Sequence, residues 1–233
     1  MKIKDPRTEL FWKVKNNNEY NALYESGIQD TSEIPRVYEF IKNLSYNTQY
    51  LEFLNNSIHE DIHAVVHTEL IKTFVITGIG VIECILYYFL KKNGWHKINN
   101  YEDLFTTSST KKLKNMDLKI ETTIKKKLVD PVAMDMNFNS ILRVSEKKDL
   151  LNQGGDHSVY ATLNKLRKLR NKTHLFLIDE HNGHDLNNFN VPELNLMKET
   201  LKIVLYSKLF KLEDNTKNQL LDFLEPKSKE LIV

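Results

Sequence analysis

Residues 73–90, TFVITGIGVIECILYYFL, form a long apolar run whose interpretation decides the fold class. As an α-helix this run would be about 27 Å long, which is close to the thickness of the hydrocarbon core of a bilayer. However, Glu83 lies near its middle, and a carboxylate there costs roughly 3 kcal/mol on membrane insertion. Thr77 and Gly78 are also only weakly apolar. We therefore expect a helix buried in a bundle or a subunit interface, and no membrane span.

The composition is typical of a globular protein. The chain has 233 residues, of which 41% are hydrophobic and 27% charged, and this excludes a disordered or fibrous chain. The net charge of +2 indicates no particular class of partner. Cys84 is the only cysteine, so a disulfide framework and a cysteine-based zinc site are excluded. No secretory signal is evident at the N-terminus, and we expect a cytoplasmic protein.

Apolar residues recur at helical spacing over most of the chain. Sustained alternation with a period of two residues is nearly absent, so the sequence predicts an all-α protein. We expect a bundle of four to five core helices over residues 33–212, a short irregular leader over residues 1–32 and a C-terminal helical tail over residues 213–233. The predicted helices cover residues 36–56, 61–92, 110–128, 138–151, 157–177 and 191–212.

Two groups of histidines raise the alternative of a metal site. Residues 59–63, HEDIH, match the zincin pattern, in which two imidazoles one helical turn apart hold zinc and the glutamate activates water. The charged Asp61 does not fit that pattern, and we favour a solvated helix start over a metal site. The second group lies mostly in a polar segment that we expect to be a loop; it comprises His174, His181 and His184. We expect no metal and no cofactor.

Residues 160–175, YATLNKLRKLRNKTHL, are the most informative stretch for function. On a helical wheel Arg167, Arg170 and His174 fall within an arc of about 60° that also contains Leu163. The lysines of this stretch lie on the opposite, solvated side. Because the whole chain has only five arginines against 28 lysines, two arginines on one packing face are unusual.

Arginine and histidine on one helix face supply groups that metal-free RNA cleavage requires. Arginine binds phosphate through paired hydrogen bonds, and histidine exchanges a proton near neutral pH. Asn171 adds an uncharged hydrogen-bonding group at the edge of the arc. Since one helix offers one histidine, a reaction with two proton transfers suggests a second copy of the chain. In the alternative interpretation, both arginines pair with acidic neighbours and His174 is a core residue; Glu83 could be such a neighbour.

The stretch from Arg167 to Leu175 resembles the HEPN superfamily, whose mark is an arginine followed after four to six residues by a histidine. Arg167 and His174 have this spacing, whereas Asn171 matches the polar residue that often follows the family's arginine, so both Arg167 and Arg170 are kept as candidates. The resemblance implies a homodimer with a composite, metal-independent endoribonuclease site. Members often act as toxins or abortive-infection effectors in bacterial defence, some with a cognate antitoxin. Others are non-catalytic modules.

The sequence therefore predicts a metal-independent endoribonuclease that works as a homodimer on RNA. The predicted catalytic residues are Arg167, Arg170 and His174, with Asn171 binding substrate. Lys125, Lys126 and Lys127 lie in a basic stretch that either tracks the phosphate backbone or is a solvated helix face. A cognate antitoxin or a sensor protein is a possible further partner. The alternative is a non-catalytic HEPN-like module that binds a nucleotide or a protein.

Overall fold

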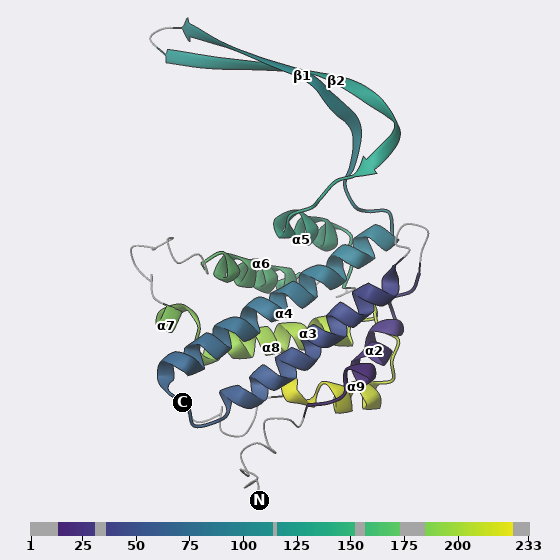
Figure 1. Cartoon of the computed structure of the whole chain (residues 1–233), viewed down its shortest axis with the longest axis vertical. Helices are drawn as coiled ribbons and strands as arrows, with labels where there is room; N and C mark the ends of the chain where they lie inside the picture. The colour runs from purple at the N-terminus through teal and green to yellow at the C-terminus, as the bar shows by residue number, and fades with distance from the viewer. Residues whose placement is uncertain (1–13, 31–35, 114–115, 152–156, 173–184, 226–233) are drawn as a thin grey trace, which may run out of the picture.

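The computed structural model describes residues 14–30, 36–113, 116–151, 157–172 and 185–225. In these ranges a body of packed helices carries a long two-stranded arm that projects from one end (Figure 1). The all-α prediction is therefore wrong, because the chain is a mixed α/β protein whose only described sheet is the antiparallel pair of the arm.

The apolar run quoted above lies within α4 (Ala64–Lys92), the longest described helix of the body. This helix contacts α3 (Val37–Ile58), α5 (Phe138–Lys147), α6 (Ser158–Asn171) and α8 (Val191–Tyr206). By length and composition α4 could cross a membrane, but 61% of its most apolar window is buried inside the body. Its apolar side chains supply much of the core; those fully buried include Ile71, Phe74, Val75, Ile79, Ile82 and Leu86.

Two glycines of α4 face different surroundings. A Cβ atom on Gly78 would lie 3.0–3.1 Å from side-chain atoms of Met197, so glycine allows α4 and α8 to approach closely. A Cβ atom on Gly80 would have nothing within 4 Å. Gly78 therefore has a packing role, whereas Gly80 borders open space.

Residues expected to form an irregular leader contain the helix α2 (Asn17–Glu25). Asn16 begins it with a capping box, in which its side chain accepts from the backbone of Asn18 and Glu19 bonds back to the Asn16 N–H. Tyr20 and Tyr24 of this helix are fully buried. The short length of α2 hides its apolar period, whereas the polar sequence NNNEY, which starts it, resembles a loop.

Two ion pairs of Lys15 join the start of the described chain to α3 and to its C-terminal end. Lys15 Nζ lies 2.9 Å from a carboxylate oxygen of Glu52 on α3 and 2.5 Å from one of Asp222. Asp222 begins the 3₁₀ turn η1 (Asp222–Leu224), which follows α9 (Asp214–Leu220). Both C-terminal elements therefore pack on the body. The remaining short helix, α7 (Asp185–Asn188), is joined to α4 by a 2.8 Å contact between Lys72 and Asp185.

The arm consists of β1 (Ile98–Leu113) and β2 (Met116–Ala133), which pair antiparallel with Phe105 opposite Ile124. The predicted helix over residues 110–128 is therefore wrong. Residues 118–125, LKIETTIK, alternate between apolar or threonine positions and charged ones for part of their length, and they are rich in β-branched side chains, which favour strands. The lysines of this stretch are also typical of a solvated helix, and the alternation with a period of two residues was missed.

Most arm side chains are exposed, and the arm is held together across its strands. Asp103 lies 2.8 Å from Lys125, Glu102 lies 3.0 Å from Lys126, and the Thr106 and Thr123 hydroxyls are 3.1 Å apart. Such cross-strand pairs contribute only about 0.2–1 kcal/mol each. In the described ranges the strands contact each other and make few contacts with the helices, so the helical body owes little of its stability to the arm.

Replacing residues 101–130 with a short Gly-Ser linker should leave the body folded. Asn99 and Val132 remain paired at the base, so the linker closes a gap that is already narrow. We expect the melting temperature of the helical body, followed by circular dichroism, to change by no more than about 4 °C, which corresponds to roughly 1 kcal/mol. Loss of cooperative helical unfolding in the shortened chain would contradict this.

Candidate anion-binding cleft

Arg167 and Arg170 are placed by the helix α6. Its apolar residues Leu163 and Leu166 are fully buried, and this fixes the rotation of the helix. The hydroxyl of the buried Tyr160 donates to the Ser145 carbonyl at 3.0 Å, which joins α6 to α5. Because the two arginines are three residues apart, they leave the same side of α6.

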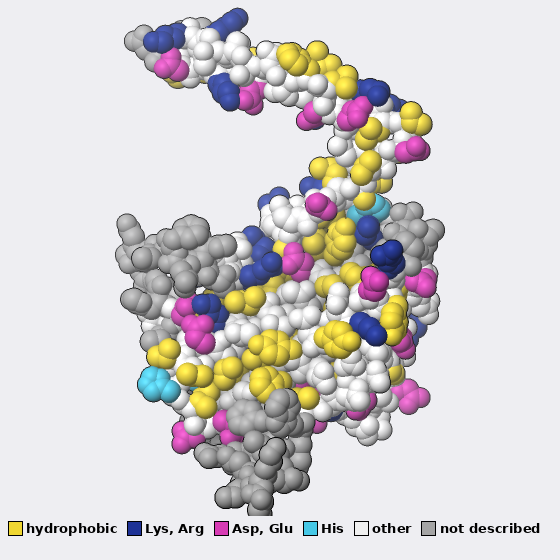
Figure 2. Space-filling view, viewed as in Figure 1, with side chains coloured by type: hydrophobic (Ala, Val, Ile, Leu, Met, Phe, Trp, Pro, Cys, Tyr) yellow, Lys and Arg dark blue, Asp and Glu magenta, His cyan; other side chains and the backbone are white. Residues whose placement is uncertain are grey.

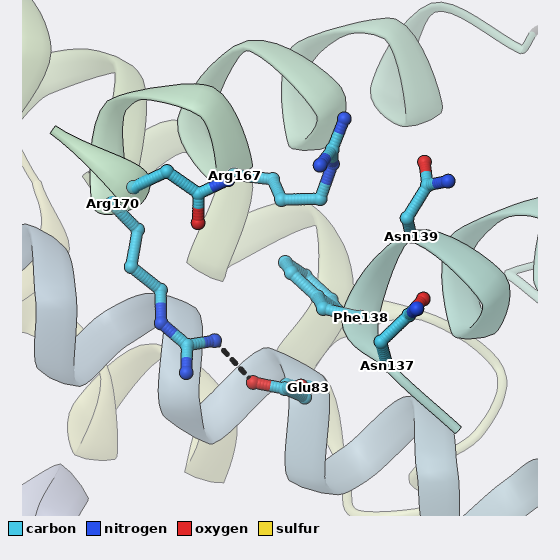
Figure 3. Close-up of a pocket in the computed structure, with 7 residues that line it drawn as sticks. Glu83, Asn137, Phe138, Asn139, Arg167 and Arg170 are labelled. Atoms are coloured by element: carbon cyan, nitrogen blue, oxygen red, sulfur yellow. Dashed lines mark hydrogen bonds and ion pairs between the residues drawn. The ribbon is translucent and has the colours of Figure 1, made fainter.

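The two arginines line a cleft with a volume of about 690 Å³ between α6, α4 and the start of α5 (Figure 3). Arg170 extends toward Glu83 on α4, whereas Arg167 extends toward the first residues of α5. The other residues that line the cleft are polar apart from one ring; they are Asn137, Phe138, Asn139 and Asn171.

Glu83 accepts a short charge-assisted hydrogen bond from the Arg170 guanidinium. This contact explains the carboxylate in the apolar helix α4, because a partly buried charge needs an opposite charge or donors. The side chains remain partly exposed, at 26% for Glu83 and 40% for Arg170. Arg170 thus pairs with an acidic neighbour, as the alternative interpretation expected for both arginines. The exposed remainder of its guanidinium is open to the cleft.

Arg167 has a different environment. Its Nε atom is buried and has no hydrogen-bond partner among the described residues. No ion pair to Arg167 occurs in the described ranges either. A buried N–H donor without an acceptor costs free energy, so Arg167 lacks the compensation that Arg170 receives from Glu83.

The beginning of α5 adds donors to the same cleft. Asn137 caps this helix, its side chain accepting from the Ser140 N–H at 2.9 Å. The N–H groups of Phe138 and Asn139 belong to the first turn and have no acceptor within the helix. Their partial positive charge favours an anion, as do the guanidinium groups nearby. Sequence reasoning missed this contribution; the signal was Asn137 directly before an apolar period.

The predicted site is only partly brought together. Asn171 lines the cleft with the two arginines. The described part of the predicted helix over residues 157–177 is α6, which ends at Asn171. His174 lies outside the described residues.

Lys125, Lys126 and Lys127, which the sequence placed on a helix, lie on β2 of the arm, and the cleft is lined by none of them. Lys125 and Lys126 pair with acidic residues of β1, which reduces the positive charge that they offer to RNA. The basic stretch is therefore part of a strand, whose successive side chains point to opposite faces, and not a helix face.

The geometry of a zincin motif is absent at residues 59–63. These residues connect α3 and α4 instead of forming one helix, and the His63 side chain caps α4 by accepting from the Val65 N–H at 3.3 Å. Within the described ranges no three His, Cys, Asp or Glu side chains gather into a possible metal site. His181 and His184 lie outside those ranges.

The chain matches no protein-family model, and no curated protein or solved structure is significantly similar to it. A functional proposal for this chain therefore depends on the geometry of its own cleft and on the residues 167–175.

Neutralising Glu83 should strengthen anion binding in the cleft. In Glu83→Gln the carboxylate charge beside Arg170 is lost, and an incoming phosphate is no longer repelled by it. We expect inorganic phosphate to bind about threefold to tenfold more tightly by calorimetry. The free energy of unfolding should fall by no more than about 1 kcal/mol, because the ion pair is partly exposed.

Glu69→Gln is the matched control for this measurement. Glu69 is also on α4 and lies 3.7 Å from Lys72, but it does not line the cleft. The phosphate affinity of the Glu69→Gln variant should equal that of the wild type. Weaker phosphate binding by Glu83→Gln would contradict the prediction and indicate that Glu83 mainly holds Arg170 in place.

The Cys84 thiol should react slowly in the native protein. Burial, and secondarily the charge of Glu83, raises the pKa of Cys84 to about 12. At pH 8 almost no thiolate is present, and the rate of alkylation by iodoacetamide should rise about tenfold per pH unit up to that pKa. The chain unfolded in urea provides the control. A native rate at pH 8 equal to the unfolded rate would contradict this.

Proposed function

We propose that the cleft between α6, α4 and α5 binds an RNA phosphate and that the chain is a metal-independent endoribonuclease. The observation that carries the proposal is the buried, unpartnered Nε of Arg167 beside a second arginine in a solvent-accessible cleft. Residues with donors of three kinds line it: guanidinium groups, side-chain amides and the first turn of α5. Such a set suits the oxygens of a phosphodiester better than a neutral ligand.

The arginines would act on the phosphorus centre. Arg167, whose Nε lacks an acceptor in the described protein, binds a non-bridging oxygen of the scissile phosphate. Arg170 stabilises the additional negative charge as the 2′-oxygen attacks phosphorus, and Glu83 keeps its guanidinium turned toward the cleft. Asn171 donates to the sugar or to a second phosphate oxygen.

The proton transfers are assigned to His174, on the basis of the sequence alone. A base removes the 2′-hydroxyl proton as the bond between the 2′-oxygen and phosphorus forms. An acid protonates the 5′-oxygen as its bond to phosphorus breaks. The products are a 2′,3′-cyclic phosphate and a 5′-hydroxyl. Because one chain contributes one such histidine, the proposal includes a homodimer in which His174 of a second copy supplies the other transfer.

A non-catalytic nucleotide-binding module is the second candidate. It is favoured by the composition of the cleft, since none of the described residues that line it is a histidine. The same donors would then hold a nucleotide phosphate without cleaving it.

RNA cleavage in EDTA tests the proposal. Purified protein should cut single-stranded RNA and leave 2′,3′-cyclic phosphate ends, detected by mass spectrometry. Arg167→Ala, Arg170→Ala and His174→Ala should each lower the rate by about 100-fold or more, because each removes a charge or proton contribution of that size.

Arg143→Ala is the matched control, because Arg143 is an exposed arginine on α5 outside the cleft. It should cleave at the wild-type rate. Nucleotide binding that is lost in Arg167→Ala, without cleavage by the wild type, would favour the module. Cleavage that EDTA abolishes would contradict both.

A further inference from the structure

A second cavity lies on the other side of Glu83. It has a volume of about 510 Å³ and is bounded by Phe40 of α3, by Gly80, Cys84 and Tyr87 of α4 and by Asp135. This volume is within the range of about 300–1,000 Å³ that is typical of small-molecule sites. Glu83 lines both this cavity and the anion-binding cleft, so the two are adjacent.

The walls of this cavity are apolar and partly aromatic. Phe40 packs on Tyr88 with ring centroids 5.6 Å apart, and the Tyr88 hydroxyl is fixed by donating to the Gln29 carbonyl at 2.6 Å. Tyr87 presents a second, half-buried ring. Cys84 adds an uncharged surface, because burial keeps its thiol protonated. Figure 2 shows hydrophobic side chains exposed along the face formed by α3 and α4.

Gly80 keeps the cavity open. Glycine inside a helix is less favourable than alanine by about 1 kcal/mol, so its presence calls for a reason. Close packing explains Gly78, but a Cβ atom on Gly80 would touch nothing within 4 Å. Because Gly80 lines the cavity, any larger side chain there would project into the space.

The polar groups of the cavity are hydrogen-bond acceptors. Asp135 is exposed and makes no ion pair with the described part of the chain, and Glu83 is shared with the cleft. Carboxylates beside aromatic rings suit a planar ring that carries N–H donors. RNA bases that are unstacked are commonly bound in this way, by stacking on aromatic side chains and by hydrogen bonds to their edges.

We propose that this cavity is a nucleobase subsite, which holds the base of a nucleotide whose phosphate occupies the adjacent arginine cleft. The inference rests on the proposed function of that cleft as a phosphate site. Guanine is the expected base, because its Watson–Crick edge places two N–H donors side by side, opposite a carboxylate. The subsite thus gives the protein a preference for guanine in the nucleotide on one side of the bound phosphate.

Calorimetry with two ligands on the full chain tests the subsite. Guanosine 5′-monophosphate and ribose 5-phosphate carry the same phosphate and sugar and differ only in the base. The wild type should bind the nucleotide about tenfold more tightly, which is the size of one base-stacking contribution. In Gly80→Leu the added side chain occupies the cavity, and the ratio of the two affinities should fall close to one.

Thr73→Leu is the matched control for Gly80→Leu. Thr73 is half-buried on α4 two turns earlier, and it lines neither cavity. This variant should retain the tenfold ratio, and circular dichroism should give cooperative melting for both variants, since a Cβ atom on Gly80 has nothing within 4 Å and Thr73 is not a core residue.

The outcomes separate the subsite from the proposed function. Equal affinity of the two ligands for the wild type, or a ratio that Gly80→Leu leaves at its wild-type value, would overturn the subsite while the phosphate cleft stands. If neither ligand binds, both the subsite and the proposed phosphate cleft are overturned. A tenfold ratio that is lost in Gly80→Leu, without RNA cleavage, would support the subsite and leave the endoribonuclease proposal refuted.

Discussion

The contact between Glu83 and Arg170 is the constraint on which the arrangement of the cleft depends. A carboxylate within the most apolar helix of the chain must be compensated, and the compensating charge comes from α6. Packing of Leu163 and Leu166 sets the rotation of α6, so the arginine that reaches α4 is specified. Its neighbour Arg167 then points toward the start of α5, where no carboxylate meets it in the described structure.

The two arginines therefore differ in their surroundings, although they lie on the same face of α6. Arg170 has part of its charge balanced by Glu83, which fixes its position and lowers its attraction for an anion. Arg167 has no such partner in the described ranges, and its buried Nε favours a bound acceptor. One guanidinium is thus positioned and the other is available. The spacing to His174 favours Arg167, but spacing contains no information on which helix lies opposite, so it could not show which arginine pairs with Glu83.

The sequence was informative where one period extends over several turns. The buried helix over residues 73–90 and the arginines on one face of residues 158–171 follow from apolar spacing alone, and Glu83 pairs with an arginine as one of the alternatives required. The arm was not found, because lysines in residues 111–127 suggest a solvated helix while the β-branched residues opposite each other become informative only once two strands are paired. The α5 N–H groups were missed because Asn137 before an apolar period signals where a helix starts but not that this start borders a cleft.

Glu83 also explains how a small helical body can recognise more than a charge. It separates a cleft rich in hydrogen-bond donors from a cavity that offers acceptors and aromatic rings. A surface suited to an anion and a surface suited to N–H donors are thus lined by residues within two turns of α4. Gly80 and Glu83 lie three residues apart on the same side of this helix, one leaving space and the other filling it. The two sites beside Glu83 therefore offer the donors and the aromatic rings that the proposed nucleotide would require for its anionic and planar parts.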